Sequence, residues 1–242
     1  NSGLGCPILG TSETVGAMKR DEVYDIFSRH YITDNLVVCV AGNFDWPQLK
    51  KLISASLSDL RINEFEEPQN VPDPEYKTTI YTKDIEQVHL SLGTCGVPFS
   101  DKRRFPLTIL NAAFGGGMSS RLFQEIREKR GLAYNVYSYH ASFKQTGLFG
   151  IYAGTSIENL GSVLELFHVE LQKIATDGLG EEELEDTREQ LKGNMLIALE
   201  STTNRMNRLA SGFIYGLKPK LPEEALAPYL QVTAKDVKTV SY

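Results

Sequence analysis

Arg127 and Tyr134, seven residues apart, are the two side chains of this sequence best suited to hold another chain by its backbone. Arg127 lies at the edge of the apolar stripe of a predicted helix, and Tyr134 begins the strand predicted after it. A helix–turn–strand unit can bring both polar tips to one side, where a guanidinium and a phenol could hold a peptide carbonyl. The alternative is a solvated arginine beside a half-buried strand tyrosine, because long charged side chains usually cover surface.

The backbone around this pair is predicted to run from loop to helix to strand. It begins with three consecutive glycines, Gly115, Gly116 and Gly117, which can turn tightly or let another chain approach closely. A helix with one apolar stripe follows, and Gly131 is suited to end it. The next residues, 133–143, are rich in tyrosine and valine and predict a strand.

The residues that usually bind a catalytic metal lack a recognisable spacing. The sequence contains neither H-E-x-x-H nor H-x-x-E-H, so no ready zinc pair is expected. Each histidine is therefore interpreted as a surface or core residue: His30, His89, His140 and His168. The glycine run is not followed by Gly-Lys-Ser/Thr, which argues against a phosphate-binding loop.

Composition narrows the class of protein. The chain has 242 residues, 41% of them hydrophobic and 23% charged, so a buried core is expected. The net charge of -6 argues against nucleic acid as the main partner. No apolar run approaches the length of a membrane span. Three scattered cysteines without C-x-x-C favour a reducing compartment. The first residue is not Met, which suggests a start within a longer protein.

Hydrophobic periodicity predicts an α+β fold, with helices covering one face of a mainly antiparallel sheet. The unbroken apolar run at 35–40 predicts a strand covered on both faces. Further strands are predicted at 78–81, 86–93, 133–143 and 147–153. Helices are predicted at 19–31, 46–60, 105–114, 156–176, 181–200, 204–215, 222–230 and 233–240. A proline-rich acidic stretch separates two domains, which gives a first domain at 1–66, a linker at 67–77 and a second domain at 78–242.

Several segments together resemble peptidase family M16, the family of pitrilysin, insulinase and the mitochondrial processing peptidases. They read GCPILGTSETV, NLVVCVAGNFD, FGGGMSSRLFQEIREKRGLAYNVYSYH and GLFGIYAGT. The likeness is greatest to the bacterial two-domain processing-protease branch and covers nearly the whole chain. It implies an M16-type metallopeptidase fold of duplicated halves that clamp a peptide in an enclosed chamber. The chain then holds the end of the first, zinc-binding-type domain and most of the second.

The resemblance also implies roles for individual residues. Arg127 and Tyr134 match the arginine and tyrosine with which the family holds the substrate backbone near zinc. Gly115, Gly116 and Gly117 match its glycine-rich segment beside the chamber. The family's metal motif, H-x-x-E-H with a later glutamate, would precede the point where this chain begins. No metal ligand or general base is therefore assigned, and the chain by itself is expected to bind no zinc and to be inactive.

The favoured hypothesis is a part of a zinc-dependent endopeptidase that supplies the chamber wall and the backbone clamp. The alternative is a non-catalytic partner or structural subunit of an M16-type assembly, and a third possibility is a small-molecule pocket in a stand-alone domain. The expected partners are a peptide substrate and a missing N-terminal half or second subunit, possibly in a homodimer; neither nucleic acid nor a membrane is expected. The cytoplasm is the expected location, and the mitochondrial matrix is the alternative.

Overall fold

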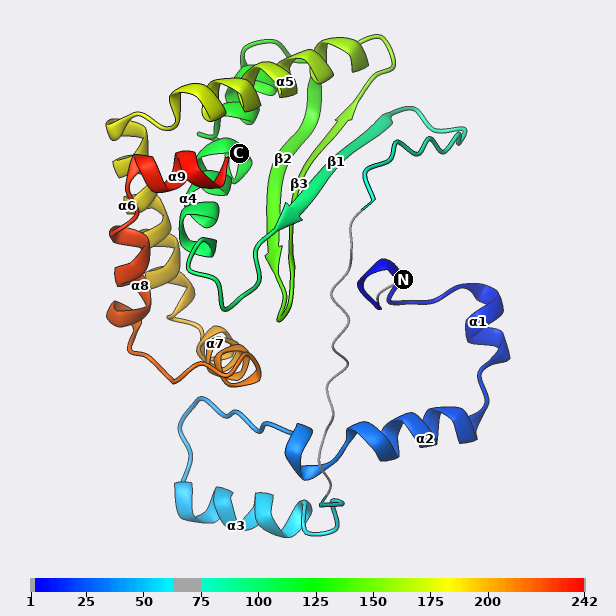
Figure 1. Ribbon diagram of the computed structural model, residues 1–242. Helices are drawn as coiled ribbons and strands as arrows, with labels where there is room; N and C mark the ends of the chain where they lie inside the picture. The colour runs from blue at the N-terminus through cyan, green and yellow to red at the C-terminus, as the bar shows by residue number, and fades with distance from the viewer. Residues whose placement is uncertain (1–2, 63–74, 242) are drawn as a thin grey trace. The chain divides into compact units, whose positions relative to one another are not determined.

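The computed structural model describes residues 3–62 and 75–241 (Figure 1). Its contacts divide the chain into two compact units. The first comprises Asn1–Asp73 with Glu200–Pro219, and the second comprises Pro74–Leu199 with Lys220–Tyr242. A segment from late in the sequence thus belongs to the first unit. The predicted domain boundaries remain a prediction, and most of the predicted linker at 67–77 lies outside the described residues.

The second unit is built on a three-stranded antiparallel sheet. Its strands are β1 (Val88–Gly96), β2 (Ala133–Ser142) and β3 (Gly147–Thr155), in the order β1-β3-β2. A tight connection joins β2 to β3, in which the Phe143 amide donates to the Thr146 carbonyl at 2.8 Å. The strands predicted at 86–93, 133–143 and 147–153 are confirmed with small shifts of their ends.

Two helices, α4 (Arg104–Gly115) and α5 (Leu160–Asp177), cover one face of this sheet, as Figure 1 shows. Three more helices, α6 (Glu181–Ala198), α8 (Pro222–Leu230) and α9 (Ala234–Val240), pack against α4. The covered face is apolar, with Val136, Ile151 and Ala153 at most 4% exposed. The other face carries polar and aromatic side chains, as an antiparallel sheet with one solvated side requires. The predicted α+β fold is confirmed.

The core of the second unit lies between the sheet and its helices. Phe114 of α4 and Phe149 of β3 meet there with their ring centroids 6.4 Å apart. Val163 and Phe167 of α5 are at most 1% exposed on the same core. Burying each such side chain contributes roughly 1.5–3 kcal/mol, so this core fixes the sheet against α4 and α5.

The first unit is mainly helical. It contains α1 (Ser12–Ala17), α2 (Arg20–His30), α3 (Trp46–Ser56) and α7 (Thr202–Ile214), with short 3₁₀ turns at Gly3–Gly5 and Thr33–Asn35. The predicted helices at 19–31, 46–60 and 204–215 are confirmed, although α3 ends at Ser56. An apolar groove of about 340 Å³ within this unit is lined by Val38, Val40 and Trp46 together with Leu209 and Phe213 of α7.

Two predicted strands are wrong. Residues 36–40 pair with no strand in the described part of the chain, and Val37, Val38 and Val40 are 40–49% exposed. The apolar run signals burial, but a strand also needs a partner that supplies its hydrogen bonds. Residues 78–81 are likewise unpaired within 3–62 and 75–241, and Ile80 and Tyr81 are 85% and 84% exposed.

Candidate functional site

Arg127 lies in a π-helix, η3 (Phe123–Glu128), where the sequence predicts an ordinary helix. The widened turn is visible in the bond from the Lys129 amide to the Gln124 carbonyl, 3.0 Å long and spanning five residues. Leu122 and Ile126 anchor it to the core at 0% exposure. Gly131, with φ +62°, ends the turn, and its amide donates to the Arg127 carbonyl at 2.9 Å.

Tyr134 is the extra residue of a β-bulge. Ala133 pairs with Thr155 and Asn135 with Gly154, which leaves Tyr134 without a partner across the ladder. A bulge locally re-aims the side chains of a strand. Tyr134 is consequently 70% exposed rather than half-buried, although its neighbour Ala133 is only 5% exposed.

The structure brings the arginine and the tyrosine together. The Arg127 guanidinium carbon lies 5.0 Å from the centroid of the Tyr134 ring and 4.8 Å from that of Phe123, both within cation–π range. Its ion pair with Glu128 is long, with Nε 3.9 Å from Oε1. Among the residues described, neither the Arg127 guanidinium nor the Tyr134 hydroxyl has a hydrogen-bond partner. Two donors therefore lie beside each other without a hydrogen-bonded acceptor among the described residues, and the Glu128 carboxylate is 3.9 Å from Arg127 Nε.

The glycine run has a packing role that its sequence does not reveal. Gly115 is the last residue of α4, Gly116 caps the helix with φ -82°, and Gly117 lies in the turn that follows. A Cβ on Gly115 would lie 2.3 Å from the backbone nitrogen of Ser138 on β2. A Cβ on Gly116 would lie 2.7 Å from the Cα of Ala112. Gly115 lets helix and strand approach closely, and Gly116 lets the chain pass close to the last turn of α4; neither adopts a left-handed backbone.

Arg121 joins the site region to the helices around it. Its guanidinium donates to both carboxylate oxygens of Glu183, at 2.7 and 2.6 Å, and to the Gly178 carbonyl at 3.1 Å. The hydrogen bonds that Arg121 donates to Glu183 raise the pKa of Arg121. Spacing could not predict this contact, because the two residues are 62 positions apart. The bidentate pair ties the start of η3 to α6.

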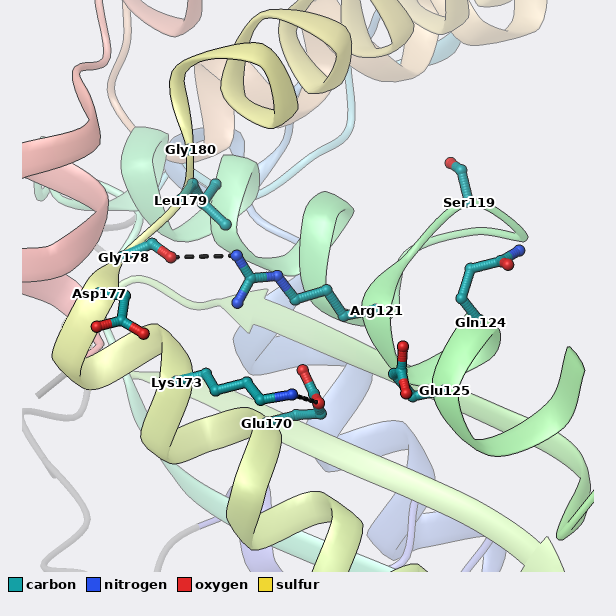
Figure 2. A pocket seen from close by; sticks show the side chains of 10 residues that line it. All are labelled: Ser119, Arg121, Gln124, Glu125, Glu170, Lys173, Asp177, Gly178, Leu179 and Gly180. Carbon is teal, nitrogen blue, oxygen red and sulfur yellow. Dashed lines mark hydrogen bonds and ion pairs between the residues drawn. The ribbon is translucent and has the colours of Figure 1, made fainter. Parts of the chain in front are cut away.

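Arg121 also lines a hollow of about 520 Å³ (Figure 2). Beside it, the Lys173 ammonium lies 2.6 Å from the Glu170 carboxylate, which is 3% exposed on α5. Glu125, on the other wall, accepts from Lys129 and Arg130, and these bonds lower its pKa to about 2. Each of these charges already has a partner of opposite sign, so we assign the hollow a structural role.

Aromatic side chains continue along the open face of the sheet. Tyr137 of β2 and Tyr152 of β3 have ring centroids 5.0 Å apart, and Tyr139 lies 6.1 Å from Tyr137. His89 of β1 shares a 2.7 Å hydrogen bond with the Tyr152 hydroxyl. Sequence patterning predicts the strands, but their register brings these rings side by side.

Within residues 3–62 and 75–241, no group of three or more His, Cys, Asp or Glu side chains could hold a metal ion. The four histidines are dispersed, with His89 on Tyr152 and His140 beside the Thr108 hydroxyl at 3.3 Å. The donors in this part of the chain therefore do not fit a zinc site. No described helix is both long and apolar enough to cross a membrane.

A family model for the Peptidase M16 inactive domain matches residues 17–191. The chain belongs to the M16 peptidase family. An uncharacterized zinc protease of Streptomyces coelicolor is 35% identical over the whole chain, which covers 54% of that protein. The uncharacterized zinc protease YmxG of Bacillus subtilis is 38% identical over 86% of the chain and 51% of its own length. The chain thus spans about half the length of the curated relatives it matches.

Solved structures agree on the fold. A protease from Helicobacter pylori matches 96% of this chain and 58% of its own, with a TM-score of 0.79 at 19% identity. A chain of complex III2 from Candida albicans matches 98% of this chain and 59% of its own, with a TM-score of 0.84 at 20% identity. The expected M16-type fold is thereby confirmed.

Proposed function

We propose that this chain is part of a zinc-dependent endopeptidase in which Arg127 and Tyr134 hold the backbone of a peptide substrate. The observation that carries the proposal is the stacked guanidinium and phenol, neither of which has an internal hydrogen-bond acceptor among the described residues. Membership of the M16 peptidase family and relatives named zinc proteases support it.

The geometry suits recognition of a carbonyl. A guanidinium that lies over an aromatic ring, as Arg127 lies over Tyr134, can use the N–H groups at its edge as donors. The exposed Tyr134 hydroxyl adds a second donor. Together they would orient the peptide bond beside them and restrict its motion, which is a contribution of positioning. The glycine run would lie beside the same peptide as part of the chamber wall.

Zinc enters this proposal only through the relatives. The described residues do not form a metal site, so we assign the metal and the attack on the peptide bond to residues outside them. The peptide clamp is the part of the reaction that this chain can supply. Any zinc would be held by a further part of the protein or by a second subunit.

The first unit supports the proposal of a protein partner. Apolar side chains of this unit are about half exposed, among them Val23, Phe27, Val38, Trp46 and Phe213. An apolar surface of this kind favours contact with more protein. We propose that it packs against the N-terminal half or a second subunit, possibly in a homodimer. Both zinc protease relatives are bacterial, which favours the cytoplasm over the mitochondrial matrix.

A non-catalytic partner or structural subunit is the second candidate. Two observations favour it: the matching family model is described as an inactive domain, and one structural neighbour is a chain of complex III2. Zinc content and cleavage of an unfolded peptide, measured on the full-length protein, separate the candidates. Stoichiometric zinc with chelator-sensitive cleavage favours the endopeptidase, and a protein with neither zinc nor cleavage favours the non-catalytic subunit.

The clamp is tested in the full-length protein with Arg127→Ala and Tyr134→Phe. Removing a charged donor from a substrate carbonyl costs about 1.5–3 kcal/mol, so Arg127→Ala should lower kcat/KM roughly 10- to 100-fold without loss of zinc. Arg29→Ala, which removes an exposed ion pair with Asp25, is the matched control. Turnover of a fluorescence-quenched decapeptide equal to wild type in the Arg127 variant would sink the clamp role.

A further inference from the structure

Phe123 is not part of the buried core of the second unit. It begins η3, and its neighbours Leu122 and Ile126 supply the buried contacts at 0% exposure. Phe123 itself is only partly buried. Its ring centroid lies 4.8 Å from the Arg127 guanidinium carbon, slightly closer than the Tyr134 ring at 5.0 Å. The ring therefore has a specific neighbour in the proposed clamp.

We propose that Phe123 is a positioning residue that holds the Arg127 guanidinium in place for a peptide carbonyl. The inference rests on the proposed function of Arg127 and Tyr134. Phe123 touches no substrate in this scheme and acts only through the arginine. Its aromatic face and that of Tyr134 restrict the guanidinium to an orientation in which its edge remains available.

Glu128 offers the guanidinium a competing position. It adjoins Arg127 in η3, and its Oε1 lies 3.9 Å from the arginine Nε, too far for a hydrogen bond. The Glu128 side chain is 53% exposed and could close that gap by rotating. Without the Phe123 ring, a closer Arg127–Glu128 pair would take up the donors that the clamp needs. The ring thus favours the arrangement in which the Arg127 donors remain available over the one in which they pair with Glu128.

An aliphatic side chain would not replace the ring. Leucine at position 123 could cover the same partly buried surface, but it lacks the electron-rich face that attracts a cation. Tyrosine retains that face. A purely structural role predicts that leucine and tyrosine differ little, whereas the positioning role predicts that only tyrosine restores function.

The test compares Phe123→Leu and Phe123→Tyr in the full-length protein, using the same fluorescence-quenched decapeptide and thermal unfolding as a control for folding. One exposed cation–π contact corresponds to a roughly 2- to 5-fold loss of kcat/KM in Phe123→Leu, with wild-type values in Phe123→Tyr. In the Arg127→Ala background, Phe123→Leu should cause no further loss, because its effect passes through the arginine.

The outcomes separate the two proposals. If Arg127→Ala lowers kcat/KM but Phe123→Leu does not, the clamp stands and the positioning role is overturned. If Phe123→Leu causes the same loss with and without Arg127, Phe123 acts independently of the arginine, which also overturns it. If Arg127→Ala itself leaves kcat/KM unchanged, the proposed function fails and the positioning role fails with it.

Discussion

Replacing Gly115 with alanine should destabilise the second unit, although alanine is the better helix former. Gly115 is the last residue of α4, where the helix lies against β2. A methyl group there would lie 2.3 Å from the Ser138 backbone nitrogen, 2.6 Å from its Oγ and 2.9 Å from its Cβ. Carbon atoms in contact normally lie about 3.5–4.0 Å apart, so helix and strand would have to separate. The backbone nitrogen and the Cβ of Ser138 are fixed by the backbone of β2, so rotation of the side chain cannot move them away.

The expected loss follows from opposing contributions. Overpacking a close contact costs typically about 1–3 kcal/mol. Separation would also weaken the 3.2 Å bond from the Ser138 hydroxyl to the Asn111 carbonyl, which is worth about 1 kcal/mol. Alanine in place of glycine raises the free energy of unfolding by up to about 1 kcal/mol, because it has a higher helix propensity and makes the unfolded chain less flexible. The net effect is a decrease of about 1–3 kcal/mol in the free energy of unfolding.

Gly117→Ala is the matched control. A Cβ there would meet only the Gln190 side-chain amide, at 3.3 Å, and that flexible group can move. Its free energy of unfolding should stay within about 0.5 kcal/mol of wild type. Urea unfolding followed by circular dichroism measures both variants, and a difference of about 1 kcal/mol corresponds to about 2–4 °C in Tm. A Gly115→Ala protein as stable as Gly117→Ala would refute the close-packing argument.

Two further predictions concern charged groups outside the clamp. Arg121→Met leaves Glu183 without its bidentate partner and should lower the free energy of unfolding by about 1–2 kcal/mol. In the double variant with Glu183→Gln, the free energy of unfolding should fall by less than the sum of the two single-variant decreases. Additive decreases in urea titrations would contradict this coupling. Burial lowers the pKa of His140 below 6.5, so the unfolded chain binds the proton first as pH falls. Stability should therefore decline as the pH drops below 6.5, and His140→Gln should reduce that decline, as measured by thermal unfolding between about pH 5 and 8. A decline of the same size in His140→Gln would contradict this prediction.

Much of the second unit follows from local sequence patterns. Alternating residues predict the hairpin of β2 and β3, and apolar spacing predicts α4, α6, α8 and α9, because each pattern is completed within a few residues. The predicted start of α5 at residue 156 is four residues too early, because the helix begins at Leu160 after its N-cap Asn159. Two competing polar residues near a helix start are not distinguished by spacing alone.

The misses share a physical cause, which is dependence on distant residues. The run at 35–40 has the composition of a buried strand, but pairing depends on another segment. The Arg121–Glu183 pair and the Gly115–Ser138 contact likewise join residues far apart in sequence. In the candidate site, the sequence predicts a helix that ends at a glycine and is followed by a strand. This pattern is enough to predict that Arg127 and Tyr134 are neighbours. The stacking on Phe123 is not predictable in this way, because the spacing indicates an ordinary helix there.

The backbone departs from regular geometry at both members of the proposed clamp. The π-helix widens the turn that carries Arg127, and the bulge adds Tyr134 to a strand whose partner has no residue opposite it. The preceding residues Ile126 and Ala133 are buried, whereas Arg127 and Tyr134 themselves are not part of the core. Such irregularities weaken hydrogen bonding and are enriched at functional sites. Their coincidence at two side chains that lie together, and that lack hydrogen-bond acceptors among the described residues, is what the proposed clamp predicts.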